Sequence, residues 1–405
     1  NVIAFRTGTK KVENNSSVSN CVILDYNSLE RDQDNLWVQF YGKHNTLQNC
    51  YLAGKTNGGP TVRVDLKGNQ SIRNFHKIVN NHFGPRPRKG GARGETIQLG
   101  SSFTSMSPSN TLIANNLFEE CNGEVEIISS KTNFNIIKNN VFYKSEGSVV
   151  TRHGNYVTID GNYFIGDGIN DQFGGIRIIN TGHWVTNNLF YKIKGKNFRS
   201  PIAIMNGIPK SPLNRYNQVT DVVVAYNKFV DSDSPFQFGV GTNIAQAAVL
   251  PKSEIRSARP LRTEVVNNVI YNSKGDENPI IEHDKADGVA FKSNMLVMVI
   301  SLTSCLDDSL PNIGDLPDFT NPTPFYNVED VSSSEFDCND VEISANYDFN
   351  FQAGSNLAVN GTQYQWSVSP SDGVTFINKD LPILEQAIKG ELATVVALED
   401  AIAKL

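Results

Sequence analysis

The chain has 405 residues, a formal net charge of −6 and a hydrophobic content of 39%, which suits one elongated domain or two compact ones. The acidic balance disfavours nucleic acid as a partner, and no run of about 18 apolar residues predicts a membrane span. No signal peptide is recognisable at the start. The five cysteines fit neither a zinc motif nor a dense disulfide framework. Cys305 and Cys338 could pair, whereas Cys21, Cys50 and Cys121 are expected to be small buried fillers.

One local cluster of bases runs against the overall acidic charge. Residues 84–93 contain Arg86, Arg88, Lys89 and Arg93. Such a cluster could bind a polyanion, or it could be a solvated surface loop, because charge alone does not distinguish the two.

A repeated sequence motif is the strongest structural signal in the chain. A short run of alternating apolar and polar residues, such as Val157-Thr158-Ile159-Asp160, is followed by a corner asparagine and then by an aromatic or aliphatic residue. The shortest spacings, 22 to 26 residues, predict a β-solenoid with three short strands per coil and insertions at its corners. The asparagine is expected to adopt left-handed backbone geometry and to bond its counterpart one coil away. An antiparallel sandwich with asparagine-rich turns is the alternative. The repeated asparagines are Asn81, Asn116, Asn140, Asn162, Asn188, Asn227, Asn268 and Asn294.

The repeat fades near residue 300, which suggests three regions. Residues 1–310 are expected to form the solenoid, and residues 311–375 an irregular extension with a few strands. Residues 376–405 have the spacing of an amphipathic helix, which we expect to cap an open end of the solenoid, or else to lie on the surface or mediate oligomerisation.

Ionisable residues concentrate in one strand-like segment. Glu124 and Glu126 are two residues apart and so should face the same side of a strand, with Lys131 shortly after them. Arg152 follows Lys131 by 21 residues, which is close to one coil, so the two should be neighbours on the outer surface. Either these groups form a surface ion ladder, or the carboxylates bind a hard cation such as Ca²⁺ beside a base and an acid.

The segment from Glu124 to Lys131, followed by Arg152-His153-Gly154, resembles polysaccharide lyase family six, which contains alginate lyases and chondroitinase B. Further phrases resemble its alginate-lyase branch: residues 54–60, 82–87, 94–100 and 174–178. The resemblance covers about residues 1 to 300 and implies a right-handed parallel β-helix, an all-β fold. It also implies β-elimination at a uronic acid, with Lys131 as the base and Arg152 as the acid. The family's calcium ligands correspond to Glu124, Glu126 and Glu95.

Two features depart from the family pattern. Ala92 stands where the family has an asparagine ligand, which leaves three possibilities: Ca²⁺ with fewer protein ligands, a water network, or Arg93 in place of the cation. The end of the chain, residues 398–405, resembles the helix that begins these lyases, which suggests a circular permutation or the start of a second domain.

Several other residues are candidates for binding the carboxylates of an anionic polysaccharide, although each could equally be an ordinary surface residue. Arg177 and His153 rank first because they neighbour the active coil. The remaining candidates are Arg86, Lys55, His183 and Arg199.

The sequence therefore predicts a secreted or periplasmic lyase acting on a uronic acid polysaccharide, with alginate as the predicted substrate. Chondroitin or dermatan sulfate is the alternative substrate, and a non-catalytic uronan-binding β-helix is the alternative function. A pectinase-type hydrolase is disfavoured, because its clustered aspartate pairs are missing and Lys131 and Arg152 would have no role in it.

Overall fold

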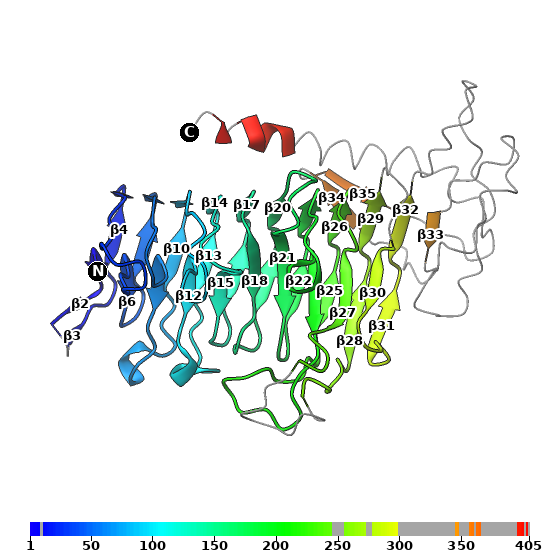
Figure 1. Cartoon of the computed structure of the whole chain (residues 1–405), viewed down its shortest axis with the longest axis horizontal. Helices are drawn as coiled ribbons and strands as arrows, with labels where there is room; N and C mark the ends of the chain where they lie inside the picture. The colour runs from blue at the N-terminus through cyan, green and yellow to red at the C-terminus, as the bar shows by residue number, and fades with distance from the viewer. Residues whose placement is uncertain are drawn as a thin grey trace, which may run out of the picture.

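The computed structural model of the chain describes residues 1–8, 11–244, 255–272, 278–298, 345–347, 356–359, 362–365, 395–400 and 402–403. Three long sheets run the length of this part of the molecule (Figure 1). The first sheet contains, in spatial order, β1 (Ile3–Ala4), β6 (Val38–Phe40), β9 (Val62–Val64), β12 (Ile97–Leu99), β15 (Glu126–Ser130), β18 (Gly147–Val150), β21 (Phe173–Ile178), β24 (Ile202–Met205), β27 (Phe236–Val240) and β30 (Ile280–Glu282).

The other two sheets carry the remaining strands of each coil. The second sheet contains β4 (Ser17–Ser19), β7 (Thr46–Gln48), β10 (Lys77–Val79), β13 (Leu112–Ala114), β16 (Ile136–Lys138), β19 (Thr158–Asp160), β22 (Trp184–Thr186), β25 (Val223–Ala225), β28 (Thr263–Val266) and β31 (Val289–Lys292). The third sheet contains β5 (Val22–Leu24), β8 (Tyr51–Ala53), β11 (His82–Phe83), β14 (Leu117–Glu119), β17 (Val141–Tyr143), β20 (Tyr163–Ile165), β23 (Leu189–Tyr191), β26 (Lys228–Val230), β29 (Val269–Asn272), β32 (Met295–Met298) and β33 (Ala345–Tyr347).

The chain visits the three sheets in turn, so that β12, β13 and β14 make up one coil and β15, β16 and β17 the next. Neighbouring strands pair in parallel, except at β33. The predicted parallel β-helix is therefore confirmed. The elements outside the coils are β2 (Arg6–Thr7), β3 (Lys11–Val12), β34 (Asn356–Val359), β35 (Thr362–Gln365), the 3₁₀ helices η1 (Asn69–Ser71), η2 (Ser102–Thr104) and η3 (Asn197–Arg199), and helical residues 395–400.

The asparagine repeat forms a continuous ladder inside the solenoid wall. Asn140 donates from Nδ2 to Oδ1 of Asn162 at 2.9 Å, and Asn162 donates in the same way to Asn188 at 2.9 Å. The residue in left-handed geometry is the one before each ladder asparagine, such as Asn139 with φ 54° and Asn187 with φ 56°. The prediction that the same asparagine adopts left-handed geometry and bonds its counterpart is therefore wrong. Two adjacent residues divide these roles, because the ladder side chain must point inward while the residue before it makes the turn.

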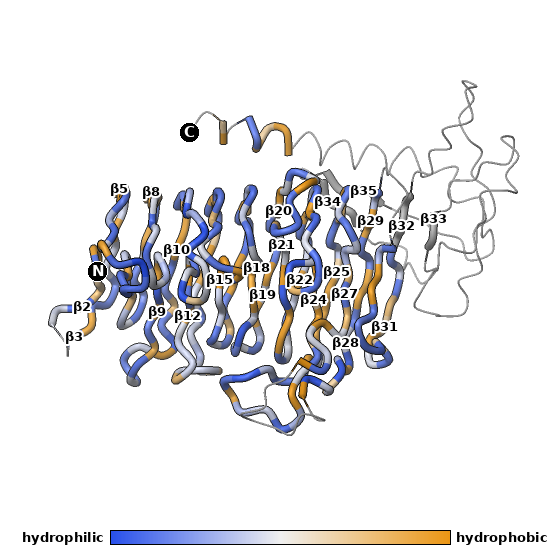
Figure 2. The backbone as a smooth tube through the Cα atoms, in the orientation of Figure 1, coloured by the Kyte–Doolittle hydropathy of each residue, from blue (hydrophilic) through white to orange (hydrophobic). Residues whose placement is uncertain are grey.

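The core is a column of aromatic rings along the solenoid axis. Phe118, Phe142, Phe164 and Phe190 stack with ring centroids 4.6 to 4.8 Å apart. Each is the inward residue of a strand in the third sheet, and each is at most 2% exposed. Hydrophobic segments accordingly recur along successive coils in Figure 2. Cys50 and Cys121 are buried free thiols, whereas Cys21 is only partly buried. Cys305 and Cys338 lie outside the described residues.

The helical residues near the end of the chain lie along the side of the solenoid (Figure 1). Val395 is 1% exposed and packs with Ile165, Leu189 and Val230 on the outer face of the third sheet. The prediction that this helix caps an end of the solenoid is therefore wrong for the described residues, because apolar side chains on the flank give it a surface to cover. Within the described residues, no helix is long and apolar enough to span a membrane.

Candidate active site

The coil that contains β15 and the next coil, which contains β18, bring the candidate residues together. Lys131 directly follows β15, and Arg152 follows β18 by two residues. These strands are neighbours in the first sheet, so the one-coil relationship expected from the 21-residue spacing is present. Their register shifts between Glu126 and Ile128. A bulge of this kind redirects a side chain, and here it lies at Glu126.

Three carboxylates meet beside Lys131. Glu95, Glu124 and Glu126 each place an oxygen within 4.8 Å of the others. The Gly94 N–H donates to Oε2 of Glu124 at 2.8 Å. Glycine is needed at position 94 because a Cβ there would lie 2.3 Å from the carbonyl oxygen of Gly123. Burial, reinforced by the charge of Glu95, raises the pKa of Glu124 to about 7.

This carboxylate cluster fits a bound cation. Oε2 of Glu95 is buried and has no hydrogen-bond partner among the described residues. A buried carboxylate oxygen without a donor is costly, and three clustered carboxylate oxygens form the donor set that Ca²⁺ prefers. The side chain of Ala92 offers no further ligand. Arg93 does not take the place of a cation either, because its exposed guanidinium forms an ion pair with Asp34.

Three basic side chains surround the carboxylates. Nζ of Lys131 lies 3.7 Å from Oε1 of Glu95, and Nε of Arg152 lies 3.1 Å from Oε1 of Glu126. Nη1 of Arg177 lies 3.9 Å from the same oxygen of Glu126. Arg177 is 5% exposed, and burial lowers its pKa. Lys131 and Arg152 thus belong to one ion network, and each keeps part of its side chain accessible to solvent.

Two aromatic residues that the sequence analysis missed hold these arginines. The guanidinium carbon of Arg152 lies 4.5 Å from the ring centroid of Tyr216, and that of Arg256 lies 3.9 Å from the same centroid. The guanidinium carbon of Arg177 lies 5.1 Å from the ring centroid of Phe198. Such contacts between a cation and a ring are attractive and help fix the guanidinium orientation. No repeat or motif marks Tyr216 or Phe198, because both belong to insertions between coils.

His153 lies beside the catalytic candidates. Its Nδ1 is hydrogen-bonded to Oγ of Ser105 at 3.1 Å, and its buried Nε2 has no partner among the described residues. Burial, followed by the charges of Arg152 and Lys131, lowers the pKa of His153 to about 3. The imidazole is therefore neutral at neutral pH, and its role in binding a substrate stays a prediction.

Three other predicted substrate-binding residues are buried with protein partners. Lys55 is 1% exposed and donates from Nζ to Oδ1 of Asn57 and to the carbonyl oxygen of Gly58. Arg86 is 2% exposed and donates to carbonyl oxygens that include those of Glu95 and Gly59. His183 is fully buried between backbone groups. These side chains stabilise loops and the solenoid wall, and they do not reach a surface where a polymer could bind.

Arg199, the remaining candidate, is partly buried at the end of η3. It interacts electrostatically with Glu146 and Asp171, and burial lowers its pKa. The structure therefore places Arg199 near carboxylates other than the three of the cluster.

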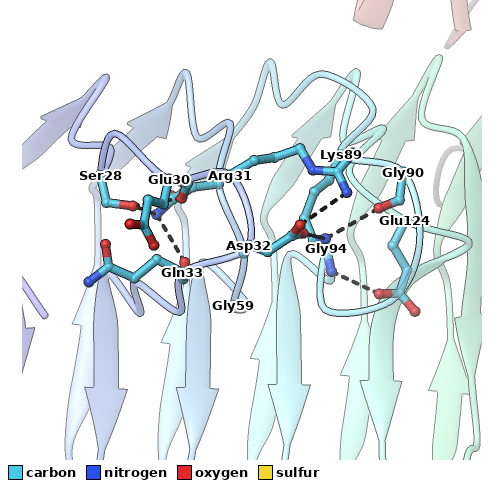
Figure 3. A network of polar contacts seen from close by, with 12 residues as sticks. Ser28, Glu30, Arg31, Asp32, Gln33, Gly59, Lys89, Gly90, Gly94 and Glu124 are labelled. Carbon is cyan, nitrogen blue, oxygen red and sulfur yellow. Dashed lines mark hydrogen bonds and ion pairs between the residues drawn. The ribbon is translucent and has the colours of Figure 1, made fainter.

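The basic loop, residues 84–93, is neutralised by protein partners. Arg88 forms two hydrogen bonds with Glu146, and Lys89 donates to Oδ1 of Asp32 at 3.1 Å. Figure 3 shows Asp32 between Lys89 and its own neighbour Arg31, with Gly94 and Glu124 beside them. The loop that carries Asp32 and Asp34 thus holds in place the segment that leads to Glu95. The basic side chains of residues 84–93 are paired within the protein, so this loop is not a free binding site for a polyanion.

Known proteins resemble the chain in sequence and in fold. The family model described as chondroitinase B matches residues 1–336. The solved structure of AlyGC, a family six alginate lyase, is 38% identical with a TM-score of 0.68, over 73% of this chain and 39% of AlyGC. A mannuronic acid specific family six lyase from human gut microbiota is 29% identical with a TM-score of 0.64, over 73% of this chain and 65% of that one.

A third structure, a family six lyase from Pseudopedobacter saltans, is 24% identical with a TM-score of 0.60, over 70% of this chain and 72% of that lyase, and supports the fold alone. No curated protein sequence matches the chain. The chain spans 39% of the length of AlyGC. Because the family model matches most of the chain, the protein belongs to polysaccharide lyase family six, in its alginate-lyase branch.

Proposed function

We propose that the protein cleaves alginate by β-elimination, with Lys131 as the base and Arg152 as the acid. The observation that carries this proposal is the ion network on adjacent coils. Lys131 lies 3.7 Å from Glu95, and Arg152 lies 3.1 Å from Glu126, beside a three-carboxylate cluster in a chain of the lyase family.

The elimination requires one proton to leave the sugar and another to reach the departing oxygen. Lys131 removes the proton from C5 of the uronate, next to its carboxylate. The electron pair forms a double bond between C4 and C5, and the bond from C4 to the glycosidic oxygen breaks. Arg152 supplies the proton, or stabilises the charge, at the leaving oxygen. Its contact with Glu126 fixes the guanidinium for this role.

The C5 proton is weakly acidic because its loss adds charge beside an anionic carboxylate. We propose that Glu95, Glu124 and Glu126 hold Ca²⁺, which would neutralise that carboxylate when bound. Arg177 and His153 are buried but lie beside Arg152, so they are the predicted substrate-binding residues nearest to the sugar.

Alginate is favoured as the substrate because AlyGC, at 38% identity, is an alginate lyase. An extracellular polymer as substrate implies a secreted or periplasmic enzyme, which we propose on that ground alone.

The test is to incubate the protein with alginate, chondroitin sulfate and dermatan sulfate and to follow the ultraviolet absorbance of the unsaturated uronate. Lys131→Ala should abolish the rise, whereas Lys138→Ala, which removes an exposed lysine on the second sheet, should not. A Lys131→Ala variant that remains folded and active would exclude the proposed base. An absorbance rise only on a sulfated substrate would move the proposal from alginate to chondroitin or dermatan sulfate.

A further inference from the structure

The outer face of the first sheet carries one residue per coil in a continuous row. Strand register links these residues in pairs from one coil to the next. Inward residues beside them, such as Val62, Val64, Ile97 and Leu99, belong to the solenoid core. We call this set the outer row, and it consists of Gln39, Arg63, Gln98, Ser129, Val150, Arg177, Ala203 and Gln237. The catalytic coils lie in its middle, at Ser129 and Val150.

Beyond Arg177 the outer row is covered by protein. Ala203 is fully buried and Gln237 is 1% exposed, although both point away from the core. The backbone N–H of Asn197 in η3 donates to Oε1 of Gln237. A second apolar cluster, which we call the apolar cover, fills this side. It contains Val150, Ile179, Ala203, Met205, Ile208, Tyr216 and Val240, with Phe198 packed against it. The space that a sugar would need beyond Arg177 is therefore occupied by side chains.

One residue of the apolar cover, Tyr216, contacts the proposed catalytic arginine, Arg152. Tyr216 is 8% exposed and stacks on Arg152, with Arg256 on the same ring. Arg256 is 5% exposed and rests against Gly241, where a Cβ would lie 2.7 Å from Nη1. Gly241 has φ +79°, so glycine is favoured there on both counts. Contacts with both guanidinium groups thus hold the Tyr216 ring in place next to Arg152.

On the other side of the catalytic coils the outer row is polar and includes a cation. Gln98 is 8% exposed and donates to the carbonyl oxygen of Gly100, so Arg63 is the most exposed residue on this side. Arg63 keeps 26% of its side chain exposed, and its Nη2 lies 3.7 Å from Oδ2 of Asp65. Its Nε has no hydrogen-bond partner among the described residues. Gln98 lies between Arg63 and Ser129. Since neighbouring strands are about 4.8 Å apart, Arg63 is roughly 10 Å from Ser129 along the solenoid axis. A polymer that runs along the axis from the catalytic coils would therefore bring a second uronate near Arg63.

We propose that the polyuronate chain extends from the catalytic coils only toward Arg63, which binds a uronate carboxylate. The Tyr216 ring blocks the chain on the opposite side. The enzyme then acts at a chain end and releases short products one after another. The proposal rests on the lyase function above and adds the direction of the chain and its carboxylate-binding residue.

The first experiment compares viscosity with absorbance during digestion of long alginate by the intact protein. Action at a chain end predicts one short product class from the earliest time points, with viscosity falling in proportion to the absorbance gained. Products of many lengths, with viscosity lost after few cleavages, would overturn the proposal. Tyr216→Ala should lengthen the early products, because it removes the ring that blocks the chain. Tyr216→Phe keeps the ring and should not lengthen them. Product length remains informative even if either variant cleaves more slowly.

The second experiment measures binding by calorimetry in the Lys131→Ala background, which separates this proposal from the lyase function. Arg63→Gln should weaken binding of a tetrauronate by about tenfold, as expected for one charge-assisted contact, and leave a diuronate nearly unchanged. Arg262→Gln is the matched control, since Arg262 is exposed and pairs only with Asp221 among the described residues. Equal affinity of Arg63→Gln and its parent for the tetrauronate would overturn the binding role, whether or not the intact protein cleaves the polymer.

Discussion

Arg152 is held between a carboxylate and an aromatic ring: its Nε lies 3.1 Å from Glu126, and its guanidinium carbon lies 4.5 Å from the Tyr216 ring centroid. Both contacts depend on the planar shape of the guanidinium. A planar guanidinium can donate to a carboxylate at its edge while a ring packs on its face, whereas a compact ammonium group does not present these two separate surfaces.

Arg152→Lys should therefore remove most of the activity although it keeps the positive charge. We expect kcat to fall by about 100-fold or more, which is the usual contribution of a positioned acid, with little change in melting temperature. The measurement is absorbance kinetics on alginate beside a thermal unfolding curve. Arg262→Lys serves as the exposed control. Near-normal kcat in Arg152→Lys would show that any cation suffices there.

Calcium should stabilise the folded protein, because the three-carboxylate cluster forms only on folding. A ligand that binds the native state alone raises the melting temperature, by an amount that grows with the ratio of its concentration to its dissociation constant. We expect Ca²⁺ to raise the melting temperature after EDTA treatment, and Glu124→Gln to remove that rise. An unchanged melting temperature of the intact protein over millimolar Ca²⁺ would argue against the cation site, independently of any activity.

Arg86→Gln should act on stability more than on substrate binding. Its guanidinium is buried and donates to loop carbonyl oxygens, which would lose these bonds in the variant. Breaking such a buried charged network costs about 3 kcal/mol of unfolding free energy. Chemical denaturation measures this loss, and Arg73→Gln, on the exposed surface, should change it by less than about 0.5 kcal/mol. Unaltered stability with a raised KM would instead support the substrate-binding role that the sequence suggested.

The buried His183 should make the protein less stable in acid. Burial lowers its pKa in the folded protein to about 4, from 6.5 as the ordinary value. Between pH 6.5 and pH 4 the unfolded chain binds a proton that the folded protein does not bind. The free energy of unfolding is therefore highest above pH 6.5 and decreases as the pH falls toward 4. The difference between the two pKa values corresponds to about 3 kcal/mol of unfolding free energy. The stability of His183→Gln should vary less over this pH range in denaturant titrations, and parallel pH curves for the two proteins would contradict the assignment.

The sequence alone determined the periodic part of this protein. A coil needs an inward apolar residue and a corner asparagine at each turn, so regular spacing revealed the parallel β-helix and the ladder from Asn81 to Asn294. The same periodicity placed Lys131 and Arg152 on adjacent coils, since one coil of chain separates them. The resemblance to the family then supplied their proposed chemical roles and pointed to Glu95.

Only the tertiary structure decided what the insertions between coils do. Lys55 and Arg86 read as surface bases in sequence, yet loop folding buries both and gives them backbone partners. Tyr216 and Arg256 lie far along the chain from Arg152, and no spacing rule connects them. Likewise, an amphipathic pattern predicts that a helix has an apolar face but not which surface it covers, so the packing of Val395 on the flank was not predictable. Periodic contacts recur at a regular spacing along the sequence and can be predicted from it, whereas contacts made by irregular loops depend on the path of the whole chain.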